Sequence, residues 1–108
     1  MKFHHVGIPT NEPKQGETYS ADSKLYITSM DDHPYRVEWL RFEPGSPLPQ
    51  IIQDVPHVAF GVKDLQKAIE GKNVLIQPKT TANGHRIAFI IESGAPIEFV
   101  QVDDAEDA

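Results

Sequence analysis

Two parts of this chain, 52 positions apart, have similar sequences, and this internal repeat limits its fold more than any other feature. Residues 3–8 (FHHVGI) align with residues 55–60 (VPHVAF), so that His5 lies over His57. Each half also ends in a strand-like segment that carries one acid before two apolar residues. These acids are Glu38 and Glu98. A repeated unit of one strand, a connection and three further strands predicts two β-α-β-β-β modules.

Hydrophobic periodicity predicts strands over most of the chain. The predicted strands are residues 2–9, 25–30, 35–42, 55–62, 74–76, 86–92 and 97–102. In the third of these, which alternates most clearly, Val37 and Trp39 face one way and Glu38 the other. Residues 43–49 contain three prolines and one glycine, a composition that excludes the interior of a strand or a helix.

One convincing helix is predicted, over residues 64–70. Asp64 suits the N-cap, Gly71 suits the position after the last turn, and the apolar residues between them have helical spacing. The corresponding segment of the first module, residues 10–22, contains Pro13 and Gly16 and has no apolar stripe, so we expect a loop there. The sequence therefore predicts an α+β fold in which two βαβββ-type modules form a cupped sheet, with the helix of the first module reduced or absent.

Composition limits the partners that this chain can have. We expect one domain over residues 1–102 and an acidic tail over residues 103–108, which holds four of the sixteen acids. The net charge is −6 and there is no Lys/Arg cluster, so neither nucleic acid nor a membrane is an expected partner. No apolar run could span a bilayer or form the core of a signal peptide, so we expect a cytoplasmic protein.

Four polar residues interrupt strand faces that are otherwise apolar or built from small residues. They are His5, Glu38, His57 and Glu98. An ionised carboxylate among apolar side chains is unfavourable unless it is paired or bound to a cation. The chain has no cysteine, so any metal must be held by nitrogen and oxygen atoms. Two imidazoles and two carboxylates suit a divalent ion of intermediate hardness, such as Zn, Ni, Co, Fe or Mn.

The strings around these residues resemble the vicinal-oxygen-chelate superfamily, which includes glyoxalase I, bleomycin-resistance proteins and extradiol dioxygenases. The matching strings are HVGI at residues 5–8, VE at 37–38, PHVAF at 56–60 and APIEFV at 95–100. The resemblance covers residues 2–101 and implies that each module supplies one His and one acid to a metal: His5 with Glu38, and His57 with Glu98.

The resemblance also implies a type of chemistry. In the superfamily, a small substrate binds the metal through two neighbouring oxygens, and the metal stabilises the negative charge that develops there. Dioxygenases of the superfamily use two His and one Glu, so Glu38 as a fourth ligand favours a lyase, isomerase or epimerase. Glu38 or Glu98 would be the catalytic group that moves a proton. We recognise no set of residues for glutathione.

Two other functions are compatible with the sequence. One is a non-enzymatic drug- or metabolite-binding protein of the bleomycin-resistance type, and the other is a dimeric scaffold without a ligand. Strand alternation places Arg36 on the face of Glu38, where it would meet an anionic substrate. A small domain with one face of a curved sheet exposed gains core by pairing, so we expect a homodimer.

Overall fold

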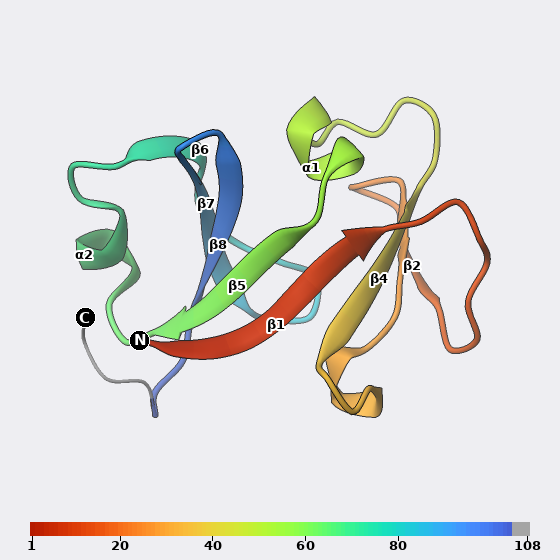
Figure 1. Ribbon diagram of the computed structural model, residues 1–108, viewed down its shortest axis with the longest axis horizontal. Helices are drawn as coiled ribbons and strands as arrows, with labels where there is room; N and C mark the ends of the chain where they lie inside the picture. The colour runs from red at the N-terminus through yellow and green to blue at the C-terminus, as the bar shows by residue number, and fades with distance from the viewer. Residues whose placement is uncertain (105–108) are drawn as a thin grey trace. The chain divides into compact units, whose positions relative to one another are not determined.

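The computed structural model describes residues 1–104, which form eight strands, two short α-helices and one 3-10 helix (Figure 1). The elements are β1 (Lys2–Pro9), β2 (Thr18–Ser20), β3 (Leu25–Ile27), η1 (Met30–Asp32), β4 (Val37–Phe42), α1 (Gln50–Asp54), β5 (His57–Val62), α2 (Leu65–Ile69), β6 (Asn73–Thr80), β7 (Arg86–Glu92) and β8 (Ala95–Gln101). The α+β class and the predominance of strands are confirmed.

The chain forms two compact units, which follow the two halves of the sequence repeat. The first unit is residues 5–56, and the second is residues 1–4 together with the chain from His57 onward. Of the predicted acidic tail, Asp103 and Asp104 are described, and Asp104 accepts a hydrogen bond from the Lys2 ammonium at 2.6 Å. Residues 105–108 of that tail lie outside the described residues. No helix in residues 1–104 has the length and apolar character needed to cross a bilayer, and the cytoplasmic location stays a prediction.

The first unit is a sheet in the order β2-β3-β4-β1. Strands β1 and β4 are parallel, and the other two pairings are antiparallel. No helix lies between β1 and β2, which confirms the expected loss of the first module's helix. The segment is not loop throughout, however, because β2 forms at residues 18–20 by pairing with β3.

Two further features of this unit differ from the prediction. The strand predicted for residues 25–30 ends at Ile27, and the chain turns into η1, where the Ser29 hydroxyl accepts a hydrogen bond from the Asp31 amide at 3.2 Å. Helix α1 was not predicted. It has five residues and no side-chain cap, and its formation coincides with the burial of Ile52, which is 2% exposed.

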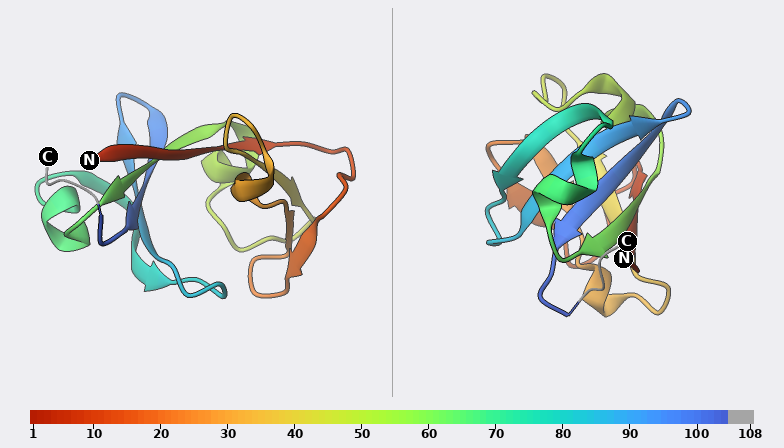
Figure 2. Two further views of the ribbon diagram at one scale, coloured as in Figure 1. Left: turned by 90° about the horizontal axis from the view of Figure 1, so that it is seen from below. Right: turned by 90° about the vertical axis from the view of Figure 1, so that its left-hand side faces the viewer.

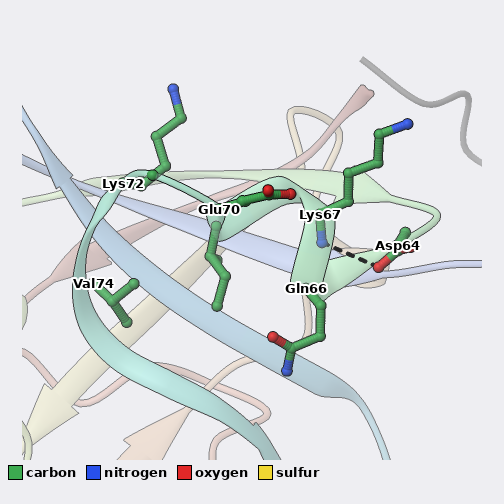
Figure 3. A pocket seen from close by; sticks show the side chains of 8 residues that line it. Asp64, Gln66, Lys67, Glu70, Lys72 and Val74 are labelled. Atoms are coloured by element: carbon green, nitrogen blue, oxygen red, sulfur yellow. Dashed lines mark hydrogen bonds between the residues drawn. The ribbon is translucent and has the colours of Figure 1, made fainter.

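The second unit is a sheet in which β5, β8, β7 and β6 follow one another, with β5 and β8 parallel. Helix α2 packs against one face of these strands (Figure 2). Its predicted N-cap is confirmed, because the Asp64 carboxylate accepts a hydrogen bond from the Lys67 amide at 3.1 Å (Figure 3). Gly71 has a φ of +73°, as the end of the helix requires. The core under α2 consists of Val62, Leu65, Ile69, Ala88, Ile90 and Phe99.

Candidate metal centre

In the second unit, His57 and Glu98 form a buried pair on two neighbouring strands. Ala59 on β5 lies opposite Glu98 on the parallel strand β8, and His57 is two residues before Ala59, so both side chains lie on one face. The imidazole Nε2 lies 2.9 Å from the carboxylate Oε1. His57 is 3% exposed and Glu98 is 7% exposed. This face is opposite the one that α2 covers.

The ring of Phe89 holds the imidazole of His57 from the side. The two ring centroids are 4.9 Å apart in an edge-on arrangement. Phe89 lies opposite Glu98 in the antiparallel pairing of β7 with β8, so it belongs to the same face as the pair. Sequence reasoning did not single out Phe89, although the alternation of residues 86–92 separates it from the core residues Ala88 and Ile90.

In the first unit, His5 and Glu38 form a second pair. Gly7 on β1 lies opposite Glu38 on β4, and His5 is two residues before Gly7. The imidazole Nε2 is 3.5 Å from the carboxylate Oε1, and the His5 side chain is 3% exposed. The Glu38 side chain is 15% exposed, so this acid is more accessible than Glu98.

The two pairs share one pattern of strand pairing. In each unit a histidine-bearing strand runs parallel to an acid-bearing strand, and the residue two places after the histidine lies opposite the acid. The sequence repeat therefore extends to the register of the sheets. This register brings the two predicted ligands of each module together.

The distances within each pair suit adjacent ligands of one ion. Two donor atoms about 2.1 Å from a metal are about 3.0 Å apart at a right angle and about 3.4 Å apart at a tetrahedral angle. The distances within the pairs are 2.9 Å for His57 with Glu98 and 3.5 Å for His5 with Glu38. His5, His57 and Glu98 are buried, and each offers a ligand atom that could hold a metal ion. A single shell of all four residues stays a prediction.

The rest of the face around the second pair is apolar. Its residues include Ala59, Ile87, Phe89 and Val100, which are all at least 94% buried. A carboxylate in such surroundings is unfavourable without an opposite charge or hydrogen bonds. In these surroundings a charged Glu98 carboxylate needs a hydrogen-bond donor or a cation at its oxygens.

Arg36 is not placed as strand alternation predicts. It precedes β4 and has a φ of +58°, so the alternation of β4 does not extend to it. Its guanidinium Nη1 lies 3.5 Å from the Asp31 carboxylate. A role for Arg36 in binding substrate stays a prediction.

A shallow surface pocket lies beside α2, where the chain enters β6 (Figure 3). Its lining includes two acids, Asp64 and Glu70, and two lysines, Lys67 and Lys72, so it has no net charge preference. None of the four predicted ligands lines it. The pocket is therefore separate from both His–Glu pairs.

Known proteins match this chain in structure but not in sequence. Neither a family model nor a curated protein sequence matches this chain. A hypothetical protein from Bacillus halodurans has a similar structure, with a TM-score of 0.69 and 20% identity over 99% of this chain and 98% of its own. A methylmalonyl-CoA epimerase from Mycobacterium tuberculosis has a TM-score of 0.65 and 16% identity over 93% and 87%. At these identities the likeness shows a shared fold and nothing about activity.

Proposed function

We propose that this chain is a metal-dependent, glyoxalase-like lyase, isomerase or epimerase of the vicinal-oxygen-chelate superfamily. Its substrate would be a small molecule with two neighbouring oxygens. The observation that carries the proposal is the identical His–Glu register in the two units. A fold that needs these residues only for packing has no reason to place an imidazole against a carboxylate twice, at the same position.

The proposed ligands are His5, Glu38, His57 and Glu98, acting together. The donor set of two nitrogens and two oxygens fits Zn, Ni, Co, Fe or Mn. When bound, such an ion supplies a Lewis acid for the negative charge that develops on the substrate's oxygens. Four protein ligands would leave room on such an ion for a substrate that binds through two oxygens.

The chain's own residues would bind the ion and move protons. Each imidazole would bind the ion through a ring nitrogen that carries no proton. A carboxylate next to the substrate takes a proton from carbon and returns it to the same or a neighbouring carbon, which needs no other reactant. Glu38, whose side chain is 15% exposed, is better placed for proton exchange than Glu98, whose side chain is 9% exposed.

A second function is favoured by one observation. The 2.9 Å contact between His57 and Glu98 is also a good hydrogen bond, which pairs the imidazole Nε2 with the carboxylate Oε1 without a metal. A protein that binds a drug or metabolite on an apolar sheet face, without catalysis, would have the same pair. The two functions differ in whether the purified protein holds metal.

Metal content therefore tests the proposal. Wild type, His5→Ala and His57→Ala are purified side by side without added metal, and the metal per chain is measured by inductively coupled plasma mass spectrometry. His33→Ala is the control, because His33 lies in the turn after η1 and on no strand. We expect metal close to one per chain in wild type and control, with strong loss in the other two variants. Binding should weaken as the pH falls, because protons compete with the ion for the imidazoles. Equal occupancy in all four proteins would refute the site.

A further inference from the structure

Two irregularities in the pairing of β6 with β7 decide which face of the second unit each residue of β6 lies on. They fall between Val74 and Ile76 and between Ile76 and Lys79. As a result, Ile76 lies opposite Phe89 and Lys79 lies opposite Ile87. Residues directly opposite one another in an antiparallel pair share a face. Ile76 and Lys79 are therefore on the same side of the sheet, although they are three residues apart.

That side of the sheet carries the His57–Glu98 pair. Ile87 lies opposite Val100 on β8, and Phe89 lies opposite Glu98. Lys79 is thus in the row of side chains next to the row that contains Glu98. The Cα atoms of Lys79 and Glu98 are separated by two strand spacings of about 4.8 Å each and by two residues along the strand, with a rise of about 3.4 Å each. Their distance is therefore about 12 Å.

The irregularities also move Lys79 into the sheet. Val74 lies opposite Ile90, so an unbroken register would pair Lys79, five positions later, with His85 in the turn. The observed partner is Ile87, two positions further along β7. Such bulges commonly redirect a side chain next to a functional site. Here they bring a cation alongside the face of the candidate metal ligands.

Lys79 is the one lysine or arginine on that face among strands β5 to β8. The other residue of these two types in the strands is Arg86, which lies opposite Thr80 and so faces the other way. Both side chains are exposed. Within residues 1–104, Lys79 takes part in no ion pair, so no carboxylate of these residues is paired with its charge.

We propose that Lys79 binds an anionic group of the substrate, a carboxylate or a phosphate, several bonds away from the oxygens that the His57–Glu98 pair serves. The inference rests on the proposed function and names the substrate class: a small acid with two neighbouring oxygens at its other end. The four-carbon lysine chain covers part of the 12 Å estimated above, and the substrate covers the rest. Lys79 would set specificity, since it is too far from the pair to act on the reacting atoms.

The test uses zinc-loaded protein and three hydroxamates, which bind zinc through two neighbouring oxygens. Acetohydroxamate has a neutral tail, succinic monohydroxamate has a carboxylate, and 3-phosphonopropionohydroxamate has a phosphonate. Affinities are measured by isothermal titration calorimetry at low salt. We expect wild type to bind at least one anionic probe about three- to fivefold more tightly than the neutral one, as for an exposed ion pair.

The matched variants are Lys79→Gln and Arg86→Gln, which remove neighbouring charges from opposite faces. Lys79→Gln should abolish the preference and leave the affinity for acetohydroxamate unchanged, whereas Arg86→Gln should keep the preference. Added salt should reduce the preference in wild type. In ¹⁵N spectra, the anionic probe should shift the Lys79 and Ile87 amides more than acetohydroxamate does.

The outcomes separate this inference from the proposed function. If acetohydroxamate binds but wild type shows no preference, or Lys79→Gln retains it, the role of Lys79 is refuted and the metal site stands. If zinc or acetohydroxamate does not bind, the proposed function fails and the inference fails with it.

Discussion

Replacing His57 by glutamine removes the imidazole that lies 2.9 Å from the Glu98 carboxylate, while the carboxylate stays in an apolar face. Hydrogen bonds to charged groups contribute about 1.5–3 kcal/mol, and removing one partner of a buried pair costs about 3–5 kcal/mol. Because both side chains are less than one-tenth exposed, we expect the free energy of unfolding to fall by about 3 kcal/mol. That corresponds to about 12 °C in Tm for a chain of this size.

The first unit provides an internal comparison. The His5–Glu38 distance is 3.5 Å, longer than an ordinary hydrogen bond, and the Glu38 side chain is 15% exposed. Water therefore offsets part of the loss when His5 is replaced. We expect His5→Gln to cost about 1 kcal/mol in metal-free protein, clearly less than His57→Gln.

The assay is urea unfolding at pH 7 with excess chelator, for wild type, His57→Gln, Glu98→Gln and the double variant. If the pair is coupled, the double variant should lose about 2 kcal/mol less than the sum of the single variants. Repeating the series in zinc at a hundred times its dissociation constant should stabilise wild type by about 2.7 kcal/mol and the variants far less. Costs that add within about 0.5 kcal/mol would show that the two side chains do not depend on one another, and would refute the reasoning.

Four other predictions follow from packing, charge and assembly. Leu65→Ala should lower the free energy of unfolding by about 3 kcal/mol, because Leu65 is 1% exposed, whereas Gln66→Ala on the exposed side of the same helix should change it by less than about 0.5 kcal/mol. A hydrogen bond from the Arg41 guanidinium lowers the pKa of Glu17, so the stability from this pair is present above the ordinary pKa of a glutamate and is lost as the pH falls through the lowered value. Urea midpoints of wild type and Glu17→Gln should therefore differ at pH 7 and converge in acid. Gly61→Ala would bring the new methyl group to 2.8 Å from a neighbouring side chain and should cost about 1–3 kcal/mol, so an unchanged Tm would contradict the packing. Finally, sedimentation should give a homodimer, and a single 12.1 kDa species at tens of micromolar would reject it.

The elements that could be predicted from the sequence carry their own local signals. Helix α2 has an N-cap acid at Asp64 and a glycine at Gly71, and both act as expected. Helix α1 has no such signal, because its N-cap is Pro49 and its five residues make no side-chain cap. Strand β2, with three residues, exists through its pairing with β3. Segments this short depend on tertiary contacts that their sequence does not reveal.

The candidate site divides in the same way. Alternation alone placed the histidine and the acid of each module on faces that the register then brings together. It failed at Arg36, where a positive φ interrupts the strand pattern. It also gave no sign of the irregularities that place Lys79 opposite Ile87, because an extra residue in one strand is defined only by its partner.

The two units differ on the opposite face of the sheet. Phe99, the residue after Glu98, packs in the core under α2. Its counterpart after Glu38 is Trp39, which lies under the Lys14 ammonium at 4.5 Å from the ring centroid. Nearby, the Arg41 guanidinium binds Glu17 at 2.7 and 2.9 Å. Side chains of the segment after β1 thus contact the face of the first unit that corresponds to the helix-covered face of the second unit.

This difference bears on why the His–Glu register is the same in both units. The face opposite the pairs contributes to stability in each unit, yet it is covered in two unrelated ways. In the second unit the apolar side of helix α2 covers it, and in the first unit charged side chains lie on its aromatic rings. Folding therefore tolerates wide variation there. Apolar residues of similar size would stabilise the fold about as well as the pairs do, because replacing a buried ion pair by such residues is often neutral or stabilising. The two units therefore share the His–Glu pair, which is the less favourable arrangement for folding, and differ on the opposite face, where folding tolerates variation. This pattern is expected if the pairs bind a ligand, and the metal measurements on His5 and His57 test that directly.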